Sequence, residues 1–189
     1  MKKSGFNLSV AFALAFLISS CDSFIPDPID PRLPVYSESG KNQAGAMINN
    51  EPFTDFPKSG LFGKLYSGYI WTLADTSLNI SFNLVNQNKA NTSFTITFFL
   101  EKLTPEDWKE MEKDFGKKFR FENPNVKGTI TTSSNNGNIE NKATSGQITV
   151  KYIPGAKAFA GTFGFTAHDP SGKKYVVHFG RFDYIFEPN

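Results

Sequence analysis

The clearest pattern along the chain is the alternation of apolar and polar side chains in two neighbouring segments. In residues 78–84 every second side chain is Leu, Ile or Phe, and the intervening ones are Asn or Ser. In residues 94–100 the same apolar types alternate, with Thr95 and Thr97 between them. A period of two residues is typical of a strand with one buried face and one wet face. We predict two strands here, joined through the polar loop 86–91 as a hairpin.

One segment, residues 104–115, has the pattern of an amphipathic helix instead. Thr104 is a favourable N-cap and Pro105 suits the first helical position. Trp108, Met111 and Phe115 fall on one face, and Gly116 can end the helix. We expect this apolar stripe to pack on a sheet or to close one end of a barrel.

The remaining apolar segments predict further strands, and two polar or Gly-rich segments, 54–65 and 133–143, predict loops. A turn at Asp169-Pro170-Ser171-Gly172 joins the last two strands as a hairpin. The strands expected are 44–48, 66–73, 119–121, 126–132, 147–153, 158–168 and 174–186. About eight to ten strands with one short α-helix indicate an all-β domain, either a single antiparallel sandwich or a lipocalin-like barrel.

The last strand changes phase at Gly180. Its apolar residues are 175, 177 and 179 before this glycine and 182, 184 and 186 after it. A β-bulge at Gly180 would produce that shift, and glycine suits a bulged residue with a positive φ. The inward face of the closing hairpin is then expected to hold Phe159, Phe163, Phe165, Val177, Phe179, Phe182 and Tyr184.

The first residues have a different pattern. Two lysines precede an apolar run, which is followed by Ile18-Ser19-Ser20-Cys21. This layout is typical of a secretory signal with a small-residue cleavage site and resembles a bacterial lipobox. The apolar run is shorter than the about 20 residues that a membrane-spanning helix needs. We therefore expect residues 1–20 to be a signal peptide and Cys21 to be the lipidated first residue of the mature chain. The alternative is an unpaired thiol after an ordinary signal.

Residues 21–39 carry four prolines and predict an extended tether, so that the β domain is expected to span residues 40–189. The whole chain has 20 Lys and Arg against 18 Asp and Glu, but Lys2 and Lys3 lie in the signal, and 20 − 2 leaves 18 against 18. A mature chain with no net charge lacks the basic patch of a nucleic-acid-binding protein. Because Cys21 is the one cysteine, neither a disulfide nor a cysteine metal site is expected.

Two short stretches resemble an uncharacterised family of Bacteroidota lipoproteins. Gly40-Lys41-Asn42, Gly45 and Asn49 are similar to its opening pattern, Gly-x-Asn-Thr-Phe-Gly followed by Val-Asn-Gly, although Gln43-Ala44 replace Thr-Phe. Residues 161–167, Gly172 and Gly180-Arg181-Phe182-Asp183 resemble its closing hairpin. The resemblance implies a β fold and a lipid anchor, and assigns no active site.

The candidate chemistry is sparse. His168 and His178 lie on the two arms of the closing hairpin, too far apart to share a metal, and the acids of 106–114 alternate with lysines as on a solvated helix face. Tyr69 and Trp71 share one face of a strand and could stack on a sugar, although burial in the core is the more usual place for such rings. Arg181 and Asp183 flank the expected bulge and could touch a ligand, or form a surface pair.

These observations favour a non-catalytic binding or structural module, anchored by a lipid at the outer membrane or cell surface. We expect no cofactor, metal or nucleic-acid partner; besides the membrane, a glycan, an apolar ligand or a protein are the candidate partners. A carrier of a small apolar ligand in a Phe-lined barrel is the first alternative, and a small hydrolase, for which we see no nucleophile–base pair, is the second. An open, empty barrel would favour the carrier, and a filled core would favour the binding module.

Overall fold

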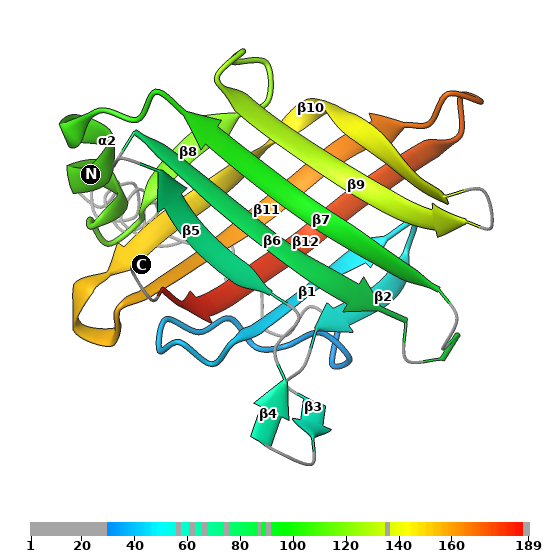
Figure 1. Cartoon of the computed structure of the whole chain (residues 1–189), viewed down its shortest axis with the longest axis horizontal. Coiled ribbons are helices and arrows are strands. Elements are labelled where there is room, and N and C mark those ends of the chain that lie inside the picture. Colours follow the sequence, from blue (N-terminus) through cyan, green and yellow to red (C-terminus); the bar gives the residue numbers. More distant parts are fainter. Residues whose placement is uncertain are drawn as a thin grey trace, which may run out of the picture.

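The fold is an antiparallel β-barrel (Figure 1). The computed structural model describes residues 30–55, 58–60, 63–65, 68–73, 76–86, 88–89, 92–134 and 137–186. Within them, strands pair in the order β11-β12-β1-β2-β6-β7-β9-β10, and β10 pairs with β11 to close the ring. Its eight strands are β1 (Gln43–Ile48), β2 (Glu51–Asp55), β6 (Ser77–Val85), β7 (Ser93–Glu101), β9 (Val126–Ser134), β10 (Gly137–Ile153), β11 (Ala158–His168) and β12 (Lys174–Ile185). Of the two architectures expected, the barrel is therefore confirmed.

In the described part of the chain, four shorter strands and two short helical elements interrupt this meander. β5 (Tyr69–Leu73) pairs with β6, β8 (Lys117–Arg120) pairs with β10, and β3 (Lys58–Gly60) pairs with β4 (Gly63–Leu65) as a separate hairpin. The helix α2 (Pro105–Met111) lies between β7 and β8, and a short 3-10 turn (Pro154–Ala156) joins β10 to β11. Residues 133–134 and 137–143, expected as parts of a loop, instead belong to β9 and β10, and residues 137–140 are exposed.

The middle of the barrel is occupied by aromatic side chains. The alternating apolar residues of β6 and β7 point inward as their pattern predicted, and all are buried except Phe94, which is partly buried. β6 and β11 are four strands apart in either direction around the ring. Yet Phe82 of β6 meets Phe163 of β11 with ring centroids 5.4 Å apart, and Phe98 of β7 meets Phe163 at 5.1 Å. Rings from facing walls thus touch across the barrel's centre.

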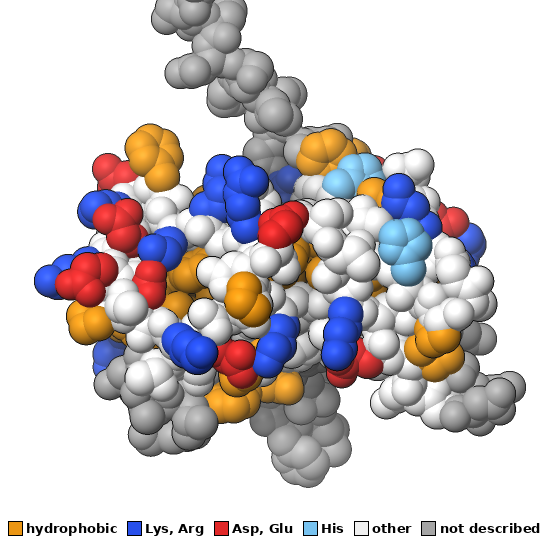
Figure 2. Space-filling view, turned by 90° about the horizontal axis from the view of Figure 1, so that it is seen from above, with side chains coloured by type: hydrophobic (Ala, Val, Ile, Leu, Met, Phe, Trp, Pro, Cys, Tyr) orange, Lys and Arg blue, Asp and Glu red, His pale blue; other side chains and the backbone are white. Residues whose placement is uncertain are grey.

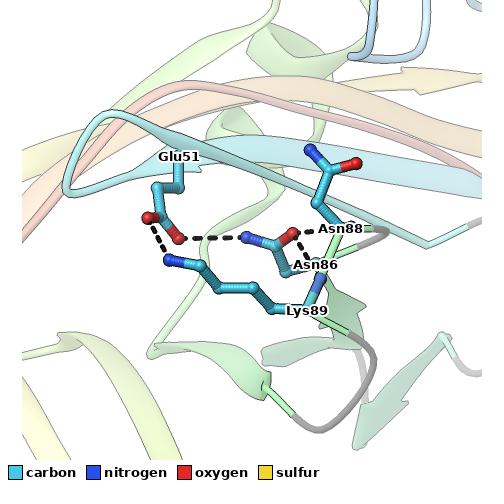
Figure 3. Close-up of polar contacts among 4 residues, drawn as sticks. All are labelled: Glu51, Asn86, Asn88 and Lys89. Carbon is cyan, nitrogen blue, oxygen red and sulfur yellow. Dashed lines mark hydrogen bonds and ion pairs between the residues drawn. The ribbon is translucent and has the colours of Figure 1, made fainter.

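The wall has one weakly paired seam, between β2 and β6. In register the two strands share the single pair Thr54–Val85. Side chains reinforce this end of the seam (Figure 3): the buried Asn86 amide donates to Glu51, which also forms an ion pair with Lys89. The Asn86 side-chain oxygen accepts from the backbone N–H groups of Asn88 and Lys89 and so shapes the β6–β7 loop. The barrel is thereby closed here by polar side chains in addition to backbone pairing.

The helix α2 is shorter than expected. Its start is as predicted, because Thr104 accepts from the Asp107 N–H while the Asp107 carboxylate accepts from the Thr104 N–H, a capping box. The helix ends at Met111, whose side chain is fully buried, while Trp108 packs partly buried against Phe159. Phe115 lies beyond the helix and is 93% exposed, so its expected place in the apolar stripe is wrong.

The bulge predicted in the last strand is confirmed, with a different division of roles. Phe163 pairs with Gly180 and Phe165 with Val177, so that two residues of β12, His178 and Phe179, face one residue of β11. The positive φ, 53°, falls on Phe179 and not on Gly180. Phe179 consequently turns outward and is 43% exposed, which corrects its expected inward position.

Residues 33–41, here called the strap, lie against the outer side of β1 and β12 (blue in Figure 1). Leu33 is 3% exposed, and Pro34 packs on Gly45 so closely that a Cβ there would lie 2.4 Å from the proline ring. Residues 33–39 were placed in the tether on sequence grounds; in the structure they pack on the barrel. The expected signal peptide and Cys21 lie outside the described residues.

Candidate functional site on the outer wall

An aromatic platform, defined here as Tyr69, Trp71 and Phe99, lies on the outer wall formed by β5, β6, β7 and β9. These four strands run side by side across the front of Figure 1. Ile70 of β5 points inward and is buried, so that its neighbours Tyr69 and Trp71 point outward. Tyr69 is 56% exposed. The two predicted site residues of β5 therefore lie on the surface and not in the core.

Strand register brings further side chains to the platform. Trp71 pairs with Asn79, Asn79 with Phe99, and Phe99 with Lys127, which makes one row across four strands. The Trp71 and Phe99 ring centroids lie 6.4 Å apart at an angle of 39°, on either side of Asn79. The Asn79 side-chain oxygen is buried and has no hydrogen-bond partner among the described residues. A buried polar atom without a partner costs stability, so this row of the wall is not explained by packing alone.

The next row of the same wall is hydroxyl-rich. Tyr69 pairs with Ser81, Ser81 with Thr97, and Thr97 with Thr129. The Ser81 and Thr97 hydroxyl oxygens are 3.0 Å apart and share a hydrogen bond. At the far edge, the Lys127 ammonium lies 5.6 Å from the centre of the Phe99 ring and pairs with Glu101 at 3.0 Å. The surface next to the rings is thus formed mainly by neutral groups that can both donate and accept hydrogen bonds.

Sequence reasoning missed Phe99 and Lys127 because the pairing of strands far apart in sequence was not readable from the chain. A signal for Phe99 was nevertheless present. It stands at an outward position of β7, in phase with Thr95 and Thr97, where the alternation calls for a polar residue. An apolar residue out of phase on a half-buried strand is therefore a marker for a surface aromatic site.

The other two predicted site residues, Arg181 and Asp183, hold the strap. The Asp183 carboxylate, 1% exposed, accepts hydrogen bonds from the backbone N–H groups of Ser39, Gly40 and Lys41 at 3.2, 2.8 and 3.0 Å. Arg181, 7% exposed, donates to the carbonyl oxygen of Pro34 at 3.4 Å. Both side chains contact the chain's own backbone, on the β1–β12 wall and away from the platform.

The strap carries a second set of polar contacts. The Lys151 ammonium of β10 pairs with Glu38 at 2.6 Å, and the Tyr36 hydroxyl donates to the other oxygen of Glu38 at 3.0 Å. Burial and the Glu38 carboxylate raise the pKa of Tyr36 above its ordinary value. The strap is therefore fixed at both its middle and its end.

A hollow of about 560 Å³ lies where the β7–α2 and β8–β9 connections meet. Its Asp107 carboxylate pairs with Lys117 at 2.6 Å. Burial alone would raise the pKa of Asp107, but the bonds from Lys117 and Thr104 outweigh it and the pKa lies below the ordinary value. Such a paired carboxylate stays ionised, which suits a structural contact between α2 and β8.

The described residues contain no group of three or more His, Cys, Asp or Glu side chains placed to hold a metal ion. No helix among them is long and apolar enough to cross a membrane. On the face drawn in Figure 2, side chains of opposite charge are interspersed and hydrophobic side chains form separate small patches. Comparison with protein-family models, with curated proteins and with solved structures gives no match for this chain.

Proposed function

We propose that this protein is a lipid-anchored, non-catalytic binding module of the bacterial cell envelope that binds an extended glycan on the outer wall of its barrel. The observation that carries the proposal is the contrast between the barrel's two sides. Aromatic rings from facing walls touch at its centre, whereas a second set of rings is presented outward on β5 and β7. A carrier of an apolar ligand would need the central rings to separate, so the outer wall is the favoured surface.

The chemistry of the platform favours a sugar chain. The C–H face of a pyranose ring is attracted to the negative face of an aromatic ring. Its hydroxyl groups pair with neutral hydroxyl and amide side chains, of which Asn79, Ser81, Thr97 and Thr129 stand beside the rings. A nucleic acid would instead require an excess of positive charge, and the expected mature chain has none.

The proposal predicts that the full chain migrates more slowly in a native gel when the gel contains a polysaccharide that the protein binds. Neutral polysaccharides are tested one by one. Trp71→Ala should reduce the affinity by several-fold to more than ten-fold, because one stacked ring contributes roughly 0.5–1.5 kcal/mol beyond its buried area. Tyr69→Ala should act in the same direction. Phe115→Ala is the matched control, since Phe115 is an exposed aromatic residue outside the platform.

If the Trp71→Ala and Tyr69→Ala variants are slowed by the polysaccharide as much as the parent, the platform is not the binding surface. If the Phe115→Ala control loses the retardation to the same degree, the effect is a general one of surface aromatic residues and also contradicts the platform. The absence of retardation in every neutral polysaccharide tested would contradict the glycan.

A further inference from the structure

A pocket of about 460 Å³ lies on the wall opposite the platform, where the bulge of β12 faces β11 and β10. It is lined by Gln147, Thr162, Phe163, Gly164, His178, Phe179, Gly180 and Arg181, and is called here the bulge pocket. The pocket exists because the bulge sets two residues of β12 opposite one residue of β11. That one residue is Gly164, where a Cβ would find nothing closer than 3.4 Å. The missing side chain leaves the space open.

The wall of the pocket is an aromatic residue in a conformation that its side chain disfavours. Phe179 has a φ of 53° and is 43% exposed. A bulky residue in the left-handed region is strained, and a large exposed ring gains little from burial. Asparagine or glycine would fit this backbone better. Backbone strain of this kind clusters at binding and active sites.

The polar side chains that line the pocket include no lysine and no carboxylate. The His178 ring lies against Phe179 with centroids 4.6 Å apart, and its Nε2 atom is buried without a hydrogen-bond partner among the described residues. Gln147 of β10 and Thr162 of β11 line the same pocket. An imidazole, an amide and a hydroxyl can each donate and accept a hydrogen bond, which is also the property of a sugar hydroxyl.

The one cation at the pocket's edge is already engaged by the fold. Arg181 is 7% exposed, and its guanidinium donates to the carbonyl oxygens of Phe179 and Pro34, both at 3.4 Å. Its hydrogen bonds therefore hold the bulge and the strap. This arrangement favours an uncharged ligand over a carboxylate or a phosphate.

We propose that the bulge pocket binds one neutral hexopyranose unit, stacked on Phe179 and hydrogen-bonded to His178, Gln147 and Thr162. The site is independent of the proposed platform, because β6 and β11 lie on facing walls of the barrel. The two sites share the class of ligand but no residue. A saccharide that bound both would be held at two opposite faces of one molecule.

The test uses the fact that the chain has only two histidines. The full chain, in detergent micelles, is titrated with methyl glycosides of neutral hexoses while the imidazole Cε1–H signals are followed by NMR. The His178 signal should shift and saturate, whereas the signal of His168, exposed at the far end of the same hairpin, should stay in place. Equal titrations with glucuronate and with benzyl alcohol represent a charged sugar and an apolar ring.

Two variants separate binding from folding. Gly164→Ala places a methyl group in the pocket at an unstrained position and should abolish the His178 shift with an unchanged melting temperature. Phe179→Asn should weaken binding at least ten-fold while melting no lower than the parent, because asparagine tolerates the positive φ. Trp71→Ala, which tests the platform, should leave the His178 titration unchanged.

The proposal is overturned if His178 and His168 fail to shift at millimolar concentrations of every neutral glycoside, or shift together. It is equally overturned if glucuronate or benzyl alcohol binds more tightly than the neutral sugars. A Phe179→Asn variant that melts well below the parent would show that the ring serves packing. If the Trp71→Ala variant is no longer slowed in polysaccharide gels but its His178 signal still shifts with the glycosides, the platform and the bulge pocket are each supported as a separate site.

Discussion

At position 180 the lack of a side chain lets the Phe163 ring lie directly against the backbone of β12. A Cβ on Gly180 would lie 2.3 Å from that ring, which is itself packed against Phe82 and Phe98 at the barrel's centre. The ring cannot move aside without disturbing both neighbours. Gly180 is thus required by packing, while the strained backbone of the bulge belongs to Phe179.

Gly180→Ala is therefore expected to destabilise the protein by about 1–3 kcal/mol, the usual effect of overfilling a packed core. The measurement is a denaturant melt of the two variants Gly180→Ala and Gly164→Ala. Gly164 is the matched control, since it lies nearby on β11 and its added Cβ meets only ordinary contacts. Similar melting of both variants would contradict the role given to the Phe163 ring.

A second residue-scale feature is the Tyr184 hydroxyl of β12, which donates to the buried Asp55 carboxylate of β2, on the other side of β1. Burial, and then the Asp55 charge, raise the pKa of Tyr184. Because the folded pKa lies above the unfolded value of about 10, this contribution to stability is complete below pH 10 and is lost as the pH rises further.

Tyr184→Phe should lower the free energy of unfolding at neutral pH by about 1–3 kcal/mol, since a buried acceptor loses a donor. As the pH is raised above 10, the free energy of unfolding of the variant should also fall less than that of the parent. Tyr69→Phe, at an exposed position, should change neither quantity. Parallel stability curves for the parent and Tyr184→Phe above pH 10 would contradict the linkage.

At the scale of elements, α2 shows how far a local pattern determines structure. Its buried contact with the barrel rests on Met111, with Trp108 partly buried beside Phe159. Met111→Ala should destabilise the protein by about 2–5 kcal/mol in a denaturant melt. Phe115→Ala, in the same segment but 93% exposed, should stay within about 0.5 kcal/mol of the parent. If Phe115→Ala destabilised the protein more than Met111→Ala, Phe115 and not Met111 would hold this segment to the barrel.

The elements that could be predicted are those whose signal is local. The alternation in 78–84 and 94–100, the Thr104 cap and the phase change at Gly180 each depend on residues close in sequence, and each appears in the structure. The end of α2 was wrong because the apolar stripe continues in sequence after the chain has turned. The stretch 133–143 predicts a loop because it is rich in Asn and Ser, yet residues 137–143 belong to the strand β10.

The candidate site was harder to predict because it depends on partners far apart in the chain. Tyr69 and Trp71 could be named, but whether they face outward is decided by the burial of Ile70 against the barrel's interior. Likewise, the strap contacts of Asp183 join residues more than a hundred positions apart. The residues next to Asp183 and those next to Gly40 carry no pattern that predicts this contact.

At the scale of the whole molecule, the filled barrel and the proposed lipid anchor together assign binding to the outer walls. The anchor is tested by Cys21→Ser, which should move the protein from the membrane fraction to the soluble fraction and abolish labelling by a radioactive fatty acid. The readout is cell fractionation with metabolic labelling of parent and variant. A Cys21→Ser protein that remains membrane-bound and labelled would contradict the anchor.

The docked strap also has a mechanical consequence. With the chain held at Leu33, 33 − 21 gives 12 residue-to-residue steps from the proposed anchor at Cys21 to the barrel, a maximal reach of roughly 40 Å. If the strap were released up to Gln43, 43 − 21 would give 22 steps and a maximal reach of roughly 75 Å. If Cys21 carries the proposed anchor, docking of the strap on the barrel shortens the free segment and keeps the barrel within the shorter of these distances from the lipid. The proposal then implies that the barrel meets its partners most often when they too are attached to the envelope.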